Sequence, residues 1–187
     1  MKPHYVSSKP AYSALANLAT QSIAASWPDQ LHKKIVPYCI DQWLNHYDLA
    51  ETGGEVVEVS SQGFFYLFDL GPDRLIAAWG VSQGRVGADR DKSRMQGYPL
   101  GAGTSYHRGH TIPHRLGGGT DINLAAQLGS VNIGPFRALE KRAVSTPGSL
   151  YFTYWMYWAD SRRQVASKIQ QGLVSYGTPP DIGVFNN

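Results

Sequence analysis

Apolar positions in the first third of the chain recur at helical spacing. They do so over residues 11–27, where Pro28 is expected to end the helix. A second helix is expected over residues 29–47. Pro37 interrupts it, because a proline inside a helix removes a backbone donor and clashes with the preceding turn. We therefore expect residues 1–50 to be helical, with a kink or a break into two short helices near Pro37.

The pattern changes to that of β-strands after the turn signal Gly53-Gly54. Three short segments rich in branched and aromatic residues follow at 55–60, 64–70 and 75–81, and glycine-containing turns separate them. This pattern predicts an antiparallel meander.

Two further strands are expected nearer the end of the chain. Residues 150–158 alternate, and a turn at 159–161 is expected to let residues 165–176 pair back on them. The tail from Gly177 is expected to be either tacked down or frayed. One face of the first of these strands is expected to lie in the core rather than stack on bases; it comprises Leu150, Phe152, Tyr154, Met156 and Trp158. Helices followed by antiparallel strands predict the α+β class.

Length and composition add a single compact domain to this picture. A chain of 187 residues that is 42% apolar and 17% charged falls in the globular range, and we expect one domain over residues 1–187. Cys39 is the only cysteine, which excludes an intrachain disulfide and a cysteine-only zinc site. No apolar run approaches 18 residues, and the first ten residues lack the apolar stretch of a signal peptide. We therefore expect neither a membrane span nor Sec-type export.

The formal net charge of +3 is modest, but the positive charge is concentrated in one stretch. This stretch overlaps a glycine-broken segment at about 82–106, which is expected to be a loop, and it ends among three histidines. Its basic residues are Arg85, Arg90, Lys92, Arg94, Arg108 and Arg115, its acidic residues are Asp89 and Asp91, and its histidines are His107, His110 and His114. Such a segment can contact a phosphate backbone, and it can equally be a solvated basic loop.

Polar residues able to do chemistry follow in the stretch 107–140. A helix is expected to start at Asn132 as its N-cap, with Pro135 in the first turn and Phe136 on its apolar side together with Leu139 and Val144. Asn132, Phe136 and Glu140 are four residues apart, so the amide and the carboxylate are expected on one helix face. His110, at the end of a preceding strand, is expected to face them.

These residue types suit phosphodiester hydrolysis. A histidine with a pKa near its usual value of about 6.5 can accept a proton from water. An asparagine carbonyl can bind Mg²⁺, which keeps most of its waters. Arg108 and Arg115 carry planar guanidinium groups that match phosphate oxygens.

The same residues resemble a known family. Arg108-Gly109-His110, the glycines 117–119, Asn123, Asn132 and Glu140 resemble the signature of the DNA/RNA non-specific endonucleases of the ββα-metal (His-Me finger) superfamily, which includes nuclease domains of bacterial polymorphic toxins. The resemblance covers about residues 106–142. It implies a ββα-metal core at about 104–146 within a sheet-containing part at 51–187.

The resemblance also implies roles for individual residues. His110 is similar to the general base, and Asn132 to the sole direct Mg²⁺ ligand, where Mn²⁺ is a candidate substitute. Glu140 resembles the carboxylate that holds a metal-bound water, Asn123 the residue that orients the site, and Arg108 the arginine that contacts phosphate. Arg115 is assigned to phosphate binding from its chemistry.

The position before Arg108 departs from the family, which usually has aspartate where this chain has His107. Two other interpretations therefore stay open. One is a zinc-dependent hydrolase that uses His107, His110 and His114, although Gly109 and Pro113 disfavour the helix that such spacing needs. The other is a nucleic-acid-binding or interaction module without catalysis.

The interpretation that follows is a Mg²⁺-dependent endonuclease that hydrolyses DNA, with RNA as a second candidate substrate. The resemblance to toxin domains implies a bacterial effector without a Sec signal peptide that acts in the cytoplasm of a target cell; otherwise the protein is expected in the cytoplasm of its own cell. A nuclease of this kind is expected to have a cognate immunity protein, and a basic cleft would suit an acidic inhibitor.

Overall fold

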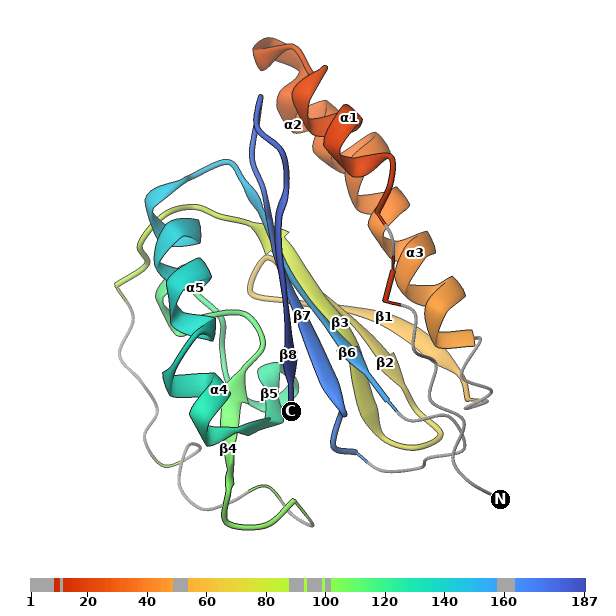
Figure 1. Cartoon of the computed structure of the whole chain (residues 1–187), viewed down its shortest axis with the longest axis vertical. Helices are drawn as coiled ribbons and strands as arrows, with labels where there is room; N and C mark the ends of the chain where they lie inside the picture. The colour runs from red at the N-terminus through yellow and green to blue at the C-terminus, as the bar shows by residue number, and fades with distance from the viewer. Residues whose placement is uncertain are drawn as a thin grey trace.

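The computed structural model describes residues 9–10, 12–48, 54–87, 93, 99, 102–157 and 164–187. A six-stranded antiparallel sheet lies between two layers (Figure 1). The N-terminal helices cover one face of the sheet, and a two-stranded hairpin with two further helices covers the other face. The α+β class is thus confirmed, and the described residues of the N-terminal part are largely helical from Leu15 to Asp48.

The N-terminal layer is helical from residue 15 to residue 48 with few interruptions. It comprises α1 (Leu15–Thr20), the 3₁₀ turn η1 (Ala24–Ser26), α2 (Trp27–Gln30), the π-helical turn η2 (Leu31–Ile35) and α3 (Val36–Asp48). In the described part of the chain no helix is long and apolar enough to cross a membrane.

The structure corrects the expectation for Pro28 and, in part, that for Pro37. Pro28 does not end a helix: it lies in the first turn of α2, where a missing N–H group costs little. Pro37 does not break the chain into two helices, because α3 continues directly from η2. Pro37 cannot donate to the carbonyl four residues earlier, and the irregularity takes the form of the wider π-helical turn just before it.

The central sheet has the order β1-β2-β3-β6-β7-β8, and every neighbouring pair is antiparallel. The predicted meander and the predicted β6–β7 pairing are confirmed. The tail is tacked down as a further strand, β8, which the sequence did not predict as a strand. The strands are β1 (Val56–Ser61), β2 (Phe64–Asp69), β3 (Arg74–Val81), β6 (Leu150–Met156), β7 (Lys168–Val174) and β8 (Asp181–Asn186).

Aromatic side chains form the core between the sheet and α3. The Trp43 ring lies 5.5 Å from that of Trp79, 5.3 Å from that of Phe152 and 6.3 Å from that of Tyr154, measured between centroids. The predicted core role of the β6 aromatics is therefore confirmed. Trp158 and the turn at 159–161 lie outside the described residues.

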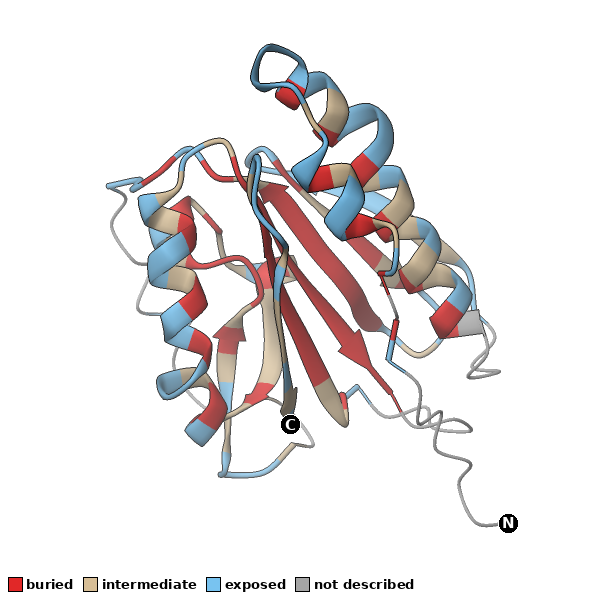
Figure 2. Ribbon diagram, turned by 45° about the horizontal axis from the view of Figure 1, so that its top comes forward, coloured by how far each residue is buried: buried red, intermediate tan, exposed pale blue. Residues whose placement is uncertain are grey.

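Strand β6 is buried on both faces rather than on one (Figure 2). The residues that alternate with Phe152 and Tyr154 are covered by the second layer. Tyr151 and Trp155 are accordingly as buried as their neighbours. A strand in the middle of a sheet that is covered on both faces loses the apolar–polar alternation of a half-exposed strand.

The second layer follows the order strand, loop, strand, helix. It consists of β4 (Tyr106–His110), the 3₁₀ turns η3 (His114–Leu116) and η4 (Asp121–Asn123), β5 (Leu124–Leu128), α4 (Gly129–Ile133) and α5 (Phe136–Ser145). Strands β4 and β5 pair antiparallel, with His110 opposite Leu124 and His107 opposite Gln127.

The predicted helix start at Asn132 is wrong. Asn132 lies inside α4, which begins at Gly129, and Gly134 leaves the helical conformation (φ −103°, ψ −117°) before α5 begins. The cause is Pro135, because a residue before proline disfavours the helical conformation. Asn132 and Glu140 therefore lie on two different helices rather than on one face of a single helix.

Phe136 lies on the apolar side of α5. Its side chain is fully buried and packs edge-on against Phe185 of β8, with 5.6 Å between ring centroids. Leu139 and Ala143 are buried on the same side of α5, and Val144 is partly buried against the core. The apolar side of α5 thus faces the sheet, as predicted.

Candidate active site

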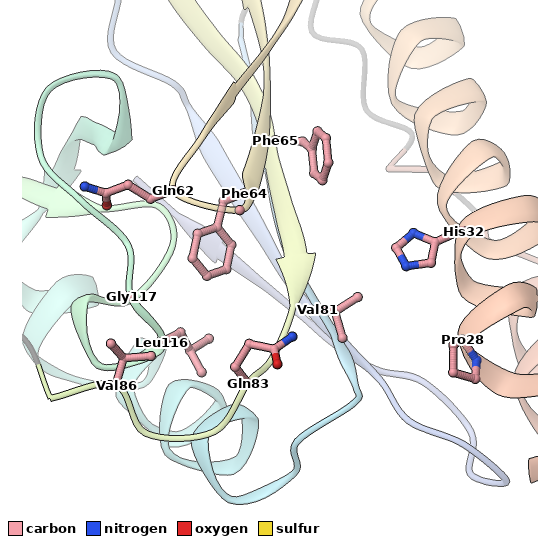
Figure 3. A pocket seen from close by; sticks show the side chains of 11 residues that line it. Pro28, His32, Gln62, Phe64, Phe65, Val81, Gln83, Val86, Leu116 and Gly117 are labelled. Carbon is pink, nitrogen blue, oxygen red and sulfur yellow. The ribbon is translucent and has the colours of Figure 1, made fainter.

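One groove of the described molecule contains none of the predicted catalytic or metal-binding residues. This groove of about 690 Å³ lies between the N-terminal helices and the ends of β2 and β3, and its walls are mainly apolar (Figure 3). Only Leu116 and Gly117 come from the second layer. The lining residues are Pro28, His32, Gln62, Gly63, Phe64, Phe65, Val81, Gln83, Val86, Leu116 and Gly117. The polar residues predicted to do chemistry lie elsewhere, around β4.

His110 is the last residue of β4, and its side chain is half-buried. Arg108 lies two positions earlier on the same strand and is also half-buried, so both side chains leave the same face of the hairpin. The ring of His114, in η3, lies beside that of His110, with 5.8 Å between centroids and an angle of 56° between planes. His110 and His114 therefore form a pair of neighbouring rings.

Asn123 is buried and holds the segment that follows His110. Its Oδ1 accepts hydrogen bonds from the Thr111 hydroxyl (2.7 Å) and from the backbone N–H of Ile112 (2.7 Å). Its Nδ2 donates to the carbonyl oxygens of Ile112 (2.8 Å) and Gly119 (2.9 Å). Three of the four hydrogen bonds of this amide therefore go to Thr111 and Ile112, the two residues that follow His110, and the fourth goes to Gly119.

The backbone after η3 requires glycine at two positions, Gly117 and Gly118. Gly117 has φ +99°, in the left-handed region. A Cβ atom on Gly118 would lie 2.0 Å from the carbonyl oxygen of Ile112. The turn therefore brings the chain close enough for the Asn123 hydrogen bonds to form.

Asn132 lies next to His107. Its Nδ2 is 3.4 Å from Nδ1 of His107, which is exposed on the opposite face of β4 from Arg108 and His110. The His107 ring also lies against the start of α4, because a Cβ on Gly129 would be 2.9 Å from its Nε2. His107 and Asn132 are thus in side-chain contact. From the sequence, His107 was notable only because the nucleases that the chain resembles usually have aspartate at this position.

Glu140 is half-buried on α5. Burial raises the pKa of the Tyr151 hydroxyl well above its ordinary value, and the negative charge of Glu140 raises it further. The Tyr151 hydroxyl accepts a hydrogen bond from Nε2 of Gln171 at 2.9 Å.

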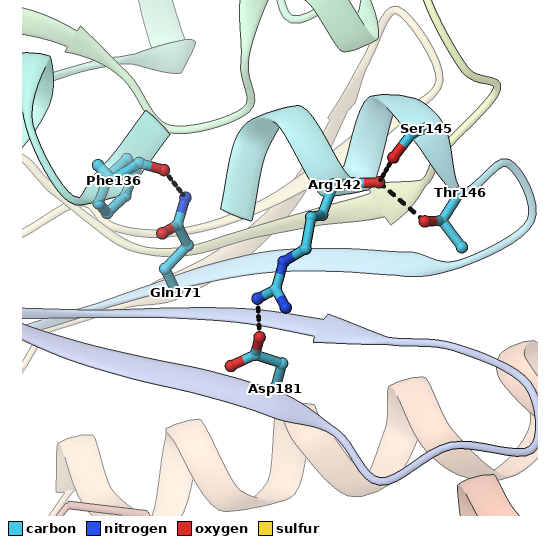
Figure 4. Close-up of polar contacts among 6 residues, drawn as sticks. All are labelled: Phe136, Arg142, Ser145, Thr146, Gln171 and Asp181. Atoms are coloured by element: carbon cyan, nitrogen blue, oxygen red, sulfur yellow. Dashed lines mark hydrogen bonds and ion pairs between the residues drawn. The ribbon is translucent and has the colours of Figure 1, made fainter. Parts of the chain in front are cut away.

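Polar contacts fasten α5 to the sheet (Figure 4). The Gln171 side chain of β7 donates to the carbonyl oxygen of Phe136 (3.0 Å) at the start of the helix. Near its end, Arg142 pairs with Asp181 of β8, and its carbonyl accepts from the hydroxyl of Thr146 (2.8 Å). The helix that carries Glu140 is therefore held at both ends.

These elements lie side by side: α4 packs against β4 and β5, and α5 packs against η3. The predicted residues thus lie on one two-stranded hairpin and the helices beside it, but on both faces of β4: Arg108 and His110 lie on one face, and His107 with Asn132 on the other. Arg115 is exposed on η3, next to His114. The further basic residues Arg90, Lys92 and Arg94 lie outside the described residues, as do Asp89 and Asp91.

The three histidines do not come together as a zinc site. His107 faces α4, whereas His110 pairs with His114. Within the described ranges, no group of three His, Cys, Asp or Glu side chains is placed to hold a metal ion. The zinc-hydrolase interpretation therefore lacks its ligand set.

Two residues at this layer escaped the sequence analysis. Gln127 is buried opposite His107, and in the part of the chain that the structure describes its amide has no hydrogen-bond partner. Asn187 accepts from the N–H of Leu128 (2.7 Å) and donates to the carbonyl of Ala126 (2.9 Å), which ties β5 to the main sheet. The sequence signal for Gln127 was a polar residue inside a short apolar segment. No sequence signal pointed to Asn187.

The chain was also compared with known proteins. No family model matches it, and no curated protein sequence matches it. The functional interpretation therefore rests on the residues and their geometry.

Proposed function

We propose that this protein is a metal-dependent endonuclease that hydrolyses phosphodiester bonds in DNA, with RNA as a second candidate substrate. The observation that carries the proposal is the buried Asn123 amide, which fixes the backbone directly after His110. It lies in a strand–loop–strand–helix segment that also holds Arg108, Asn132 and Glu140. That order supports assigning the segment to a ββα-metal core.

His110 is the proposed general base. A neutral imidazole can take a proton from the attacking water, and a well-positioned base of this kind contributes a factor of about 10² to 10⁴ in rate. The contacts of Asn123 help to position His110. The Thr111 hydroxyl and the Ile112 N–H each donate to Asn123 Oδ1 at 2.7 Å, and these two residues directly follow His110. The His114 ring beside His110 further limits the rotation of the base.

Arg108 and Arg115 are the proposed phosphate contacts. They lie on β4 and η3, the two elements that carry His110 and His114. A guanidinium group can donate two parallel hydrogen bonds to phosphate oxygens, which orients the backbone as well as neutralising it.

Asn132 and Glu140 are the proposed metal-holding residues. Their donors are an amide oxygen and a carboxylate, the hard oxygen ligands that Mg²⁺ and Mn²⁺ accept, and both side chains are half-buried rather than sealed in the core. The donor set therefore fits a divalent cation. Such an ion, when bound, neutralises charge that develops on the scissile phosphate and on the leaving oxygen.

The remaining expectations rest on the resemblance alone. An antibacterial effector role, action in a target cell and a cognate immunity protein stay predictions. Co-expression with a neighbouring gene product that protects the host from the active chain would test them.

The experiment that tests the function is incubation of the purified protein with supercoiled plasmid and, separately, with total RNA. Each is run with Mg²⁺, with Mn²⁺ and with EDTA. We expect degradation that needs the metal and is lost in His110→Ala. A matched control is His32→Ala, since His32 is exposed on η2 in the other layer. Intact nucleic acid in every lane from a folded protein would overturn the proposal in favour of a non-catalytic binding module.

A further inference from the structure

The His107–Asn132 pair leads to an inference about which metal the site prefers; it rests on the proposed function. We propose that His107 is a metal ligand together with Asn132, and that the site takes a first-row transition ion such as Mn²⁺ or Ni²⁺ in preference to Mg²⁺. The two side chains come from β4 and α4 and meet at the surface between them.

The position of the His107 ring is set by its surroundings. The ring lies over Gly129, where a Cβ atom would come within 2.9 Å of Nε2 and 3.0 Å of Cε1. The backbone N–H of Gly129 donates to the carbonyl of Ser105 (2.9 Å), which fixes α4 against the start of β4. Nδ1 is the ring nitrogen that faces Asn132.

The separation of the two polar atoms suits a shared ion. At 3.4 Å, the contact from Asn132 Nδ2 to His107 Nδ1 is long for a hydrogen bond, for which about 2.9–3.0 Å is usual. A half-turn of the amide about its Cβ–Cγ bond exchanges Nδ2 and Oδ1 with little change of shape. Two donors that each lie about 2.1 Å from one ion are about 3.0–3.4 Å apart at octahedral to tetrahedral angles.

The chemistry of the pair decides which ion is favoured. Mg²⁺ prefers oxygen ligands, whereas an imidazole nitrogen suits first-row transition ions, whose affinities rise from Mn²⁺ towards Ni²⁺. The nucleases that the sequence resembles usually have aspartate at the position of His107. A site with an imidazole ligand is therefore expected to prefer a transition ion over Mg²⁺. With Glu140 holding a bound water, as the resemblance implies, His107 and Asn132 leave positions open for further water and for a phosphate oxygen.

Calorimetric titration of the tag-free protein with Ni²⁺, Mn²⁺ and Mg²⁺ tests this inference. We expect the wild type to bind Ni²⁺ and Mn²⁺ more tightly than Mg²⁺. His107→Ala is expected to weaken binding of Ni²⁺ by about 10-fold or more, because even residues behind the ligands contribute 10- to 100-fold to metal affinity. His107→Asp is expected to move the preference back towards Mg²⁺. Thermal melting of each variant establishes that it is folded.

His110→Ala is the matched control, because it removes a histidine from the opposite face of the same strand. We expect it to abolish cleavage and leave metal affinity unchanged. If His110→Ala abolishes Ni²⁺ binding and His107→Ala does not, the ion binds at the His110–His114 pair and the inference is overturned.

Pulsed electron paramagnetic resonance of bound Mn²⁺ gives a readout that is independent of activity. We expect a ¹⁴N coupling from an imidazole ligand that disappears in His107→Ala and persists in His110→Ala. A spectrum without nitrogen coupling in the wild type would overturn the inference even if Mg²⁺-dependent cleavage is found. Nitrogen coupling in a protein that cleaves neither DNA nor RNA would support the metal site and contradict the proposed nuclease.

Discussion

Asn123 and Ile112 form a reciprocal hydrogen-bonded pair two residues after His110. The Ile112 N–H donates to Oδ1 of Asn123 (2.7 Å), and Nδ2 of Asn123 donates to the Ile112 carbonyl (2.8 Å). The side-chain amide of Asn123 thus satisfies the backbone N–H and carbonyl groups of Ile112, just after the chain leaves β4. The position of His110 consequently depends on a buried residue that contacts no solvent.

Asn123→Ala is expected to lower both stability and activity. It leaves the Thr111 hydroxyl and the Ile112 amide group without their buried partners, and each unsatisfied group costs about 1–3 kcal/mol. We expect the free energy of unfolding to fall by about 3 kcal/mol or more, measured by urea denaturation followed by tryptophan fluorescence. A loss below about 0.5 kcal/mol would contradict the assigned role.

The close approach of Gly118 to Ile112 predicts that Gly118→Ala displaces the turn. Its Cβ would lie 2.0 Å from a backbone oxygen that cannot move aside without breaking the Asn123 contacts. We expect a loss of about 2 kcal/mol or more. Gly87→Ala is the control, since nothing lies within 4 Å of its added Cβ, and it should change stability by less than about 1 kcal/mol. Equal melting temperatures for the two variants would refute the close contact.

Asn187→Ala is expected to loosen β5 from the main sheet. The side chain accepts from Leu128 N–H and donates to the carbonyls of Ala126 and Ala166. Removing it should cost about 1–2 kcal/mol and speed hydrogen exchange at the amide of Leu128. Exchange measured by nuclear magnetic resonance checks this; unchanged protection at Leu128 would show that the hairpin is held by other contacts.

Stability is expected to fall at high pH because buried tyrosines resist ionisation. Burial raises the pKa of Tyr66 to about 12, above its ordinary value of 10.0. As the pH rises, Tyr66 therefore loses its proton in the unfolded chain before it does so in the folded protein. The contribution of Tyr66 to stability is fully present below about pH 10 and is lost as the pH rises towards about 12. One such group changes the free energy of unfolding by up to about 1.4 kcal/mol per pH unit.

Tyr66→Phe tests this dependence. Urea midpoints measured between pH 8 and pH 11 should fall less steeply for the variant than for the wild type above pH 10. Curves that stay parallel over the whole range would show that Tyr66 ionises alike in the folded and unfolded states.

The sheet could be predicted from sequence where local signals agree with the final pairing. Strands β1, β2 and β3 are short, rich in branched and aromatic residues and separated by turn residues, so their limits were predicted to within a residue or two. Strand β8 was missed because its pairing comes from β7 and because Gly183 and the preceding prolines weaken the local signal.

The candidate site could be predicted only as a set of residue types. The spacing of His110, Asn123 and Asn132 was visible, but local pattern placed the helix start at Asn132, whereas packing against β4 and β5 starts α4 at Gly129. The contact of His107 with Asn132 joins residues 25 positions apart, so spacing alone does not reveal it. The same is true of Asn187 and β5.

The most direct test of the account is the rate of plasmid cleavage by His110→Ala with and without added imidazole, in the presence of the divalent metal. The account predicts a loss of about 10²- to 10⁴-fold relative to the wild type, partly restored by imidazole, which can replace the missing base in the space left by the side chain. Cleavage by His110→Ala at a rate within about twofold of the wild type would contradict the assignment of His110 as the general base.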